Sequence, residues 1–163
     1  MTYQDFFNKY NGKHVESEDP NNPFQCLDLA FAYVDFLQIP RETIRHLNAY
    51  EVWTGANDLT RKYFTLIPNT PTGVPGQGDL VVFNTVVGPS GHICIANGVG
   101  DTNTFKSLDQ NWAGHKFATT ETHNYNGVLG WLHVTGGVNY EAKYNELKTY
   151  VQQIKDILSK TGI

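Results

Sequence analysis

Cys26 is the residue best placed to act as a nucleophile in this 163-residue chain. It lies where a polar, turn-rich loop gives way to an amphipathic helix. Unpaired N–H groups and the helix dipole at a helix start favour negative charge, so a thiol there shifts toward the reactive thiolate. A backbone N–H at the same place can face a developing oxyanion. Because free cysteines are also common as small core residues, position alone leaves both interpretations of Cys26 open.

A thiol nucleophile needs a base, and the base needs an orienting group. His92 is the candidate base among six histidines, because it begins a strand-like run after a flexible Gly-Pro-Ser-Gly lead-in. If the next strand continues far enough, Asp109 and Asn111 lie on one side of it, and either could accept a hydrogen bond from the second ring nitrogen of the histidine. Taken singly, His92 can be a structural histidine and the Asp-x-Asn segment a turn.

Other uses of cysteine and histidine are less well supported. Cys94 lies within a strand-like apolar run and is expected to be a small core residue. The set Cys26, His92 and Cys94 lacks the paired short spacings of structural zinc sites. The chain also has no Gly-rich loop followed by Lys-Ser/Thr, which argues against an NTPase.

The composition argues against several broad classes of protein. The net charge is −4 and the chain has no Lys/Arg run, which does not suit a nucleic-acid binder or a basic membrane-surface helix. No apolar stretch approaches the roughly 20 residues that a membrane span needs. The N-terminus lacks a basic start followed by an apolar run, so no signal peptide is expected and synthesis in a host cytoplasm is predicted.

The hydrophobic period changes from helical to strand-like along the chain. Apolar residues from Cys26 to Leu37 recur at helical spacing and predict a helix that ends before Pro40; further helices are expected over residues 2–10 and 47–56. Short apolar runs then predict an antiparallel sheet, with strands at residues 63–67, 80–83, 93–97, 104–108 and 128–134. A helical period returns at residues 140–158. Helices followed by strands indicate an α+β fold.

Four segments, in this order, resemble the CHAP domain, the cysteine, histidine-dependent amidohydrolase/peptidase family of the papain-like and NlpC-type group. They are Phe24-Gln25-Cys26-Leu27-Asp28-Leu29, Gly78-Asp79-Leu80-Val81-Val82-Phe83, Gly91-His92-Ile93 and Asp109-Gln110-Asn111-Trp112. The resemblance is closest to endolysins of phages that infect Gram-positive bacteria. It implies N-terminal helices packed on a central antiparallel sheet, with a catalytic domain at residues 1–135. Residues 136–163 would add a C-terminal amphipathic helix, as a packing element or a linker.

The resemblance also implies the catalytic set. Cys26 would be the nucleophile, and His92 the general base that later acts as general acid toward the leaving amine. Asp109 and Asn111 match the acidic residue and the asparagine that follow in family members. Many relatives carry glutamate at the first of these positions, and Asp109 is shorter, so its reach to His92 is the point for a structure to test.

Three further residues acquire roles from the same resemblance. Gln25, next to the thiol, is a candidate contributor to the oxyanion site. Trp112 is a candidate wall of the substrate groove. Asp79 is expected to be structural, as a carboxylate that closes a loop before a central strand.

A calcium ion is one further expectation that the resemblance raises. Some phage CHAP domains bind Ca²⁺ through an acidic loop before the nucleophile and through the aspartate two residues after it. Asp28 matches that last ligand, Asp19 matches one acidic loop position, and Asn21 offers a nearby oxygen, whereas Ser17 stands where another aspartate would be. Oxygen ligands suit Ca²⁺. The other interpretation is an acidic solvated loop, with Asp28 favoured in the first helical turn by the dipole. The chemistry itself requires no cofactor.

The predicted function is hydrolysis of a peptide or amide bond of bacterial peptidoglycan, by an endopeptidase or an N-acetylmuramoyl-L-alanine amidase. The partner would be the cell wall, reached after release from the host cytoplasm, with no nucleic acid and no membrane insertion. One alternative is a catalytically weak or silent wall-binding module of a phage lysis or virion protein. Another is an intracellular deamidase or thiol protease of the same broad fold. A binding module has no need of a thiol, a base and an acid in series, which favours the enzyme.

Overall fold

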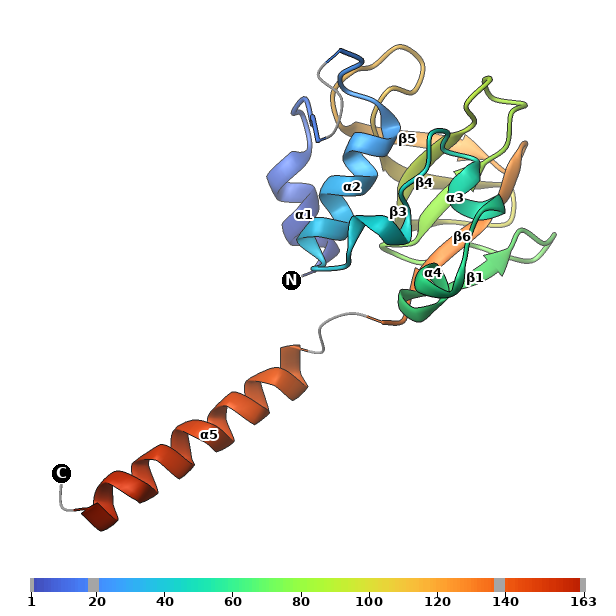
Figure 1. The fold of residues 1–163 in the computed structure, drawn as a ribbon. Helices are drawn as coiled ribbons and strands as arrows, with labels where there is room; N and C mark the ends of the chain where they lie inside the picture. The colour runs from blue at the N-terminus through green and yellow to red at the C-terminus, as the bar shows by residue number, and fades with distance from the viewer. Residues whose placement is uncertain (1, 18–20, 137–139, 162–163) are drawn as a thin grey trace.

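A six-stranded antiparallel sheet forms the centre of the fold (Figure 1). The computed structural model describes residues 2–17, 21–136 and 140–161. The strands are β1 (Phe64–Pro68), β2 (Leu80–Phe83), β3 (His92–Gly100), β4 (Thr104–Asp109), β5 (Thr119–Asn124) and β6 (Val128–Val134), in the spatial order β1-β6-β2-β3-β4-β5. The helices are α1 (Tyr3–Tyr10), α2 (Cys26–Phe36), the 3₁₀ turn η1 (Arg41–Thr43), α3 (Glu51–Thr54), α4 (Asp58–Tyr63) and α5 (Tyr140–Thr161). This architecture confirms the α+β fold.

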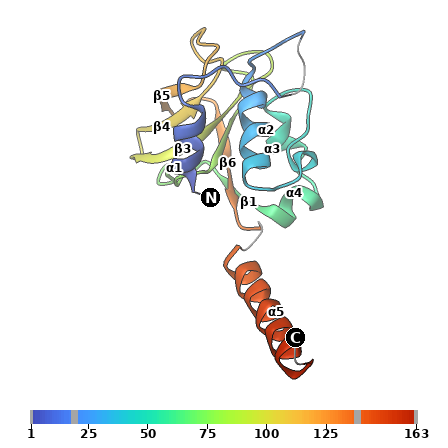
Figure 2. The same cartoon turned by 90° about the vertical axis from the view of Figure 1, so that its left-hand side faces the viewer.

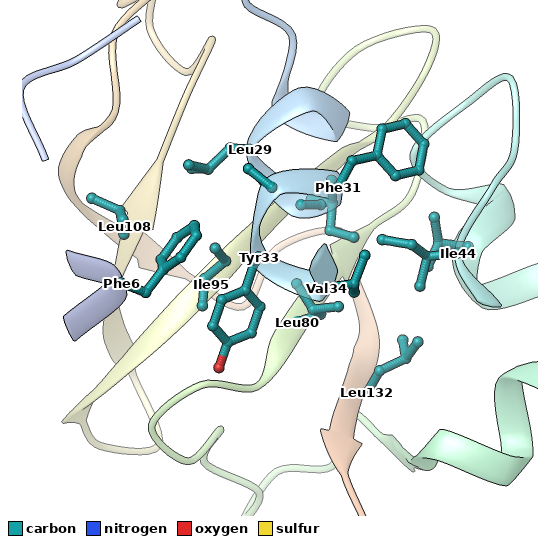
Figure 3. Close-up of a cluster of buried hydrophobic side chains, with 14 of the residues drawn as sticks. Phe6, Leu29, Phe31, Tyr33, Val34, Ile44, Leu80, Ile95, Leu108 and Leu132 are labelled. Atoms are coloured by element: carbon teal, nitrogen blue, oxygen red, sulfur yellow. The ribbon is translucent and has the colours of Figure 1, made fainter. Parts of the chain in front are cut away.

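Helix α2 packs against the sheet and supplies much of the core (Figures 1 and 3). Its predicted apolar face includes Leu29, Tyr33 and Val34, none of them more than 3% exposed. The ring of Phe6 from α1 meets the ring of Tyr33 edge-on, with 4.9 Å between their centroids. Sheet residues such as Leu80 complete the same cluster. Burial of this face fixes the first turn of α2 relative to the sheet.

Both faces of the sheet are covered, because alternate side chains of the central strands are buried on opposite sides. Val82 joins the core under α2. Its neighbour Phe83 joins a second buried cluster with Trp131 and Cys94. His92 lies two residues before Cys94 on β3 and therefore shares its side of the strand.

Strand β5 was not predicted from the sequence, although it forms one edge of the sheet. It reads Thr-Thr-Glu-Thr-His-Asn and so has no apolar run, and only His123 among its residues is buried. His123 pairs across the ladder with Phe105 of β4. The segments η1 and α4 were also missed, and α3 covers only four residues of the helix expected at 47–56. The five predicted strands and the helices at residues 2–10 and from Cys26 onward are confirmed.

Asp79 closes the loop that leads into β2, as the sequence predicted. Its Oδ2 accepts a hydrogen bond of 2.7 Å from the Gly76 N–H, and its Oδ1 lies 2.7 Å from Nδ1 of His133 on β6. The carboxyl group is buried, and burial raises the pKa of Asp79 while the hydrogen bonds from His133 and Gly76 oppose that shift. The aspartate therefore ties a loop to the middle of the sheet.

We expect Asp79→Ala to lower the free energy of unfolding by about 1–3 kcal/mol, because it removes the buried carboxylate that accepts the Gly76 N–H and pairs with His133. The matched control is His133→Ala, which removes the other partner of the same ion pair but a side chain that is half exposed. Urea denaturation of both variants measures the difference. Equal losses of unfolding free energy in the two variants would show that the hydrogen bond between Asp79 and the Gly76 N–H does not stabilise the fold.

Helix α5 follows the domain at its C-terminal side (Figures 1 and 2). The last described residues before it, Thr135 and Gly136, donate their N–H groups to the carbonyl of Tyr63, each over 2.9 Å. The helix predicted at residues 140–158 is confirmed. The division into residues 1–135 and 136–163 remains a prediction. Among the helices that the structure describes, none combines the length and the apolar character that crossing a membrane demands.

Candidate active site

Cys26 is the first residue of α2 and is half-buried. The chain reaches it through Gln25 in an extended conformation, after Phe24 with a left-handed φ of 62°. Asp28, in the first turn, accepts the Gln25 N–H over 2.7 Å through its Oδ2 and so fixes where the helix begins. The thiol therefore lies at the positive end of the helix dipole.

His92 and Asp109 form a buried pair beside this thiol. His92 is the first residue of β3 and Asp109 the last residue of β4, and their Nε2 and Oδ1 atoms lie 2.6 Å apart. The short aspartate therefore does reach the imidazole. Because Nε2 faces Asp109, Nδ1 is the ring nitrogen left to face the Cys26 thiol, whose charge also acts on His92.

The electrostatics of the pair favour a charged imidazole. Burial alone would lower the pKa of His92, but the negative charges of Asp109 and Cys26 and the hydrogen bonds to both raise it to about 10. Burial alone would likewise raise the pKa of Asp109, but His92 and the hydrogen bonds from His123 and His92 hold it below its usual value. The favoured state is therefore an ionised carboxylate next to an imidazolium.

His123 is a member of this cluster that the sequence did not reveal. Its Nε2 lies 2.7 Å from Oδ2 of Asp109 and 3.0 Å from Oγ of Ser107. Ser107 also donates its hydroxyl to the same carboxylate oxygen, over 3.2 Å. The only sequence signal was the alternation of threonine and polar residues in β5, which is typical of a polar edge strand.

Asn111 does not orient His92, and this part of the prediction is corrected. Strand β4 ends at Asp109, and Asn111 has a left-handed φ of 63°, so it leaves the side of the strand on which the aspartate lies. Its Nδ2 instead donates to Oε1 of Gln25 over 2.7 Å. Asn111 thus links the turn after β4 to the residue before the nucleophile.

Gln25 has a structural role in this linkage. Its Nε2 donates to Oδ1 of Asn22 over 3.0 Å and to the carbonyl of Pro23 over 3.1 Å, so both amide hydrogens are engaged. The side chain therefore offers no free donor to an oxyanion, so the amide of Gln25 does not provide the predicted contribution to the oxyanion site. The backbone N–H groups of the first turn of α2, that of Cys26 first, are the better candidates for that role.

Trp112 covers the imidazole of His92, with 4.9 Å between the ring centroids. It also meets His123 edge-on at 4.5 Å. Phe83 lies beneath the same rings, 5.9 Å from His92 and 5.3 Å from His123. These contacts limit rotation of both imidazoles, and the half-buried Trp112 is placed to serve as the predicted wall of a groove.

A cavity of about 480 Å³ opens at the first turns of α2, although neither Cys26 nor His92 is among its lining residues. Its lining includes Gln25 and Leu27, the two sequence neighbours of Cys26. The remaining lining residues come from the loop before α2, from α2 itself and from the segment between η1 and α3: Asn22, Asp28, Phe31, Arg45, His46 and Leu47. The cavity mixes apolar and polar side chains, which suits part of a peptide.

The structure does not test the calcium prediction. Asp19 lies outside the described residues, and Asn21 lies in a turn before α2. Both oxygens of the Asp28 carboxylate accept backbone hydrogen bonds, Oδ2 from Gln25 and Oδ1 from Ser17 over 3.3 Å. Asp28 therefore suits the capping role better than a metal site, and calcium remains a prediction. One set of adjacent side chains in the described part of the chain could hold a metal ion, Cys94, Asp109 and His123, but the last two are already hydrogen-bonded to each other.

If calcium does bind at the loop before α2, chelation should change the stability of the domain. Treatment with EDTA, followed by back-titration with CaCl₂, is expected to lower and then restore the melting temperature, because an ion that binds only the folded state stabilises it by mass action. Thermal unfolding of the wild type and of Asp19→Asn measures this. An unchanged melting temperature in EDTA would remove calcium from the account.

Two known proteins are similar to this chain in sequence. The chain is 32% identical to endolysin LysK of Staphylococcus phage K over 117 residues, which cover 68% of the chain and 22% of LysK. It is 34% identical to the probable autolysin PH of Staphylococcus aureus over 92 residues, 56% of the chain and 18% of that protein. The chain is therefore similar in sequence to one part of a phage endolysin and to one part of an autolysin. This homology confirms the resemblance that the four sequence segments indicated, although no protein-family model matches the chain.

Two solved structures share the fold of this chain. Endolysin LysIME-EF1 matches 82% of the chain with a TM-score of 0.55 and 22% identity, over 64% of its own length. Ly7917 matches 82% of the chain with a TM-score of 0.59 and 16% identity, over 63% of its length. The chain spans about a fifth of the length of the two curated relatives, so the likeness concerns one part of those larger proteins.

Proposed function

We propose that the chain is a cysteine-dependent peptidoglycan hydrolase of the CHAP type, with Cys26 as the nucleophile. One observation carries this proposal: a buried imidazole, His92, lies between an ionised carboxylate and a thiol at a helix start. This is the arrangement that activates a thiol for acyl transfer. The homology to an endolysin and an autolysin supports the cell wall as the substrate.

The reaction follows from the geometry. The Cys26 thiolate attacks the carbonyl carbon of the scissile bond, and backbone N–H groups at the start of α2 stabilise the oxyanion. The His92 imidazolium gives its proton to the leaving nitrogen, which frees the amine and leaves an acyl-thioester on Cys26. His92 then takes a proton from water, which attacks the thioester and releases the acid. Asp109 holds the imidazole in place throughout.

Two bonds are compatible with this chemistry, because the pocket selects the bond while the thiol and the imidazole do not. Cleavage within the stem peptide or cross-bridge would make the protein an endopeptidase. Cleavage between the glycan and the peptide would make it an N-acetylmuramoyl-L-alanine amidase. The structure of Ly7917 with the hydrolysis product of MDP supports a wall fragment as ligand for this fold. Action on the wall would follow release from the cell in which the chain is made.

Mass spectrometry of the muropeptides that the protein releases from purified cell walls tests the proposal and identifies the bond. Wild type should release a defined set of fragments, with new free amines at the cleaved bond. The Cys26→Ala variant is the control for activity that does not depend on the thiol. Identical fragments from both proteins would exclude the proposed mechanism.

The alternative of a silent wall-binding module predicts different thiol chemistry. Alkylation with iodoacetamide at acidic pH should modify Cys26 in the enzyme, because its partner imidazolium favours the thiolate. Cys94 should stay unmodified, since it is fully buried and burial raises its pKa well above the usual value. Two equally slow thiols would favour the binding module.

A further inference from the structure

The carboxylate of Asp109 is shared by two histidines from different strands. Oδ1 lies 2.6 Å from Nε2 of His92, and Oδ2 lies 2.7 Å from Nε2 of His123. All three side chains are buried, with exposures of 0% for Asp109, 4% for His92 and 3% for His123. A nucleophile, a base and one orienting acid do not require the second histidine, so its place needs a separate explanation.

The hydrogen bonds define which nitrogen of His123 carries a proton. An ionised carboxylate only accepts, so Nε2 of His123 must donate to Asp109. Its Nδ1 is buried and has no hydrogen-bond partner among the residues that the structure describes. In the described structure, the polar contacts of the ring are therefore those that Nε2 makes with Asp109 and with Ser107.

This donor fixes the rotation of the carboxylate. Among the described residues, the titratable and polar groups that face Asp109 come from its own strand and the two neighbouring strands: Ser107 from β4, His92 and Cys94 from β3, and His123 from β5. Ser107 donates to Oδ2 from 3.2 Å, a longer and weaker contact than the 2.7 Å bond from His123. Without His123, Oδ2 would keep only the longer hydroxyl contact, and the plane of the carboxylate would be free to turn.

The simpler explanation is that His123 is a core residue. It does pack against aromatic rings, with centroids 5.3 Å from Phe105 and 4.5 Å from Trp112. A phenylalanine would serve such packing equally well. A buried imidazole brings a polar ring and an unpartnered nitrogen, which is costly unless its other nitrogen has a function.

We propose that His123 is a positioning residue of the cysteine hydrolase, which fixes the Asp109 carboxylate so that Oδ1 meets Nε2 of His92. The inference rests on the proposed cysteine chemistry, because its effect on turnover requires His92 to be the base. The chain of contacts runs from β5 through β4 to β3 and ends at the thiol on α2. An edge strand without apolar residues thereby becomes part of the catalytic apparatus.

Two amide variants test this inference without a large change of volume or polarity. The Nε2 of glutamine occupies the position of the histidine Nε2, whereas asparagine places its amide nearer the position of Nδ1. We expect His123→Asn to lower the rate of wall lysis by about 10- to 100-fold, as part of the contribution of a positioned base is lost. It should also raise the pH at which Cys26 becomes reactive to iodoacetamide. His123→Gln should restore most of both properties.

His115→Asn is the matched control. His115 pairs over 2.7 Å with Glu121 of β5, the strand that also carries His123. The side chain of His115 is half exposed and has no contact with Asp109 in the described structure. It should leave lysis and the pH profile of alkylation unchanged. Equal behaviour of His123→Asn and His123→Gln, or losses that follow the melting temperature alone, would overturn the inference.

The alkylation measurement also separates this inference from the proposed function. Mass spectrometry locates the modified cysteine and needs no substrate. If wild type releases no muropeptides but the pH profile of Cys26 still depends on His123 as described, the proposed substrate is wrong and the positioning role stands. If lysis occurs but the pH dependence of Cys26 alkylation does not change on substitution of His123, the positioning role is wrong.

Discussion

Cys26→Ser is expected to reduce wall lysis by about 10⁴-fold or more, the scale on which removal of a catalytic nucleophile acts. A serine hydroxyl is far less acidic than a thiol, so it does not form the ion pair with His92 that the buried site favours. The fold should persist, because the half-buried side chain changes by a single atom. Turbidity of a cell-wall suspension measures lysis, and circular dichroism of the same samples measures folding.

Cys94→Ser is the matched control for this prediction. The same substitution is made on the buried strand β3, where the new hydroxyl can still face Asp109 and Ser107. It should retain most of the activity, because Cys94 has no place in the acyl transfer. Near-wild-type lysis by Cys26→Ser, or an equal loss in Cys94→Ser, would show that the nucleophile has been assigned wrongly.

Asp109→Asn is expected to have the next largest effect, a loss of about 10³- to 10⁴-fold in turnover, as for amide replacement of an orienting carboxylate in a catalytic triad. An asparagine has one acceptor oxygen and one donor nitrogen. It therefore cannot accept hydrogen bonds from His92 and His123 together, as the carboxylate does through its two oxygens. The loss of negative charge also removes a main cause of the raised pKa of His92.

The structure implies a larger loss of turnover for Asp109→Asn than the sequence suggested. Asn111 would have been a second acceptor for His92, but its side chain is hydrogen-bonded to Gln25 instead. Asp101→Asn is the control: it is the same substitution in the hairpin between β3 and β4, at an exposed aspartate that accepts backbone N–H groups of Asn103 and Thr104. Asp101→Asn should be active. A larger loss in Asn111→Ala than in Asp109→Asn would restore the asparagine as the orienting group.

The sequence predicted best where one physical pattern dominated. Helix α2 was predicted from Cys26 to Leu37 because apolar residues recur there at helical spacing, although the structure buries every residue from Asp28 to Val34. The central strands were predicted because both of their faces are buried, which gives each of them a continuous apolar run. The pair of His92 and Asp109 followed from the order of motifs, and the structure brings their side chains together as expected.

The failures of prediction have physical causes too. Strand β5 has one buried residue among polar ones, so its period-two signal was too weak to read, and His123 was lost with it. The inference about Asn111 assumed that β4 continued, but a left-handed residue ends the alternation at that point. The role of Gln25 depended on which donors its amide already satisfied, and those partners are known only once the loop before α2 is folded.

The dispersal of the site over α2, β3, β4 and β5 has a consequence for the folding pathway. The thiol and its partners are far apart in the chain, and contacts between distant residues form late because loop closure opposes them. α2 can form early without an imidazole beside its first residue. We expect pulse alkylation at acidic pH during refolding to leave Cys26 unreactive until β3, β4 and β5 have paired. The nucleophile would then report the completion of folding, and an incompletely folded chain would be chemically inert.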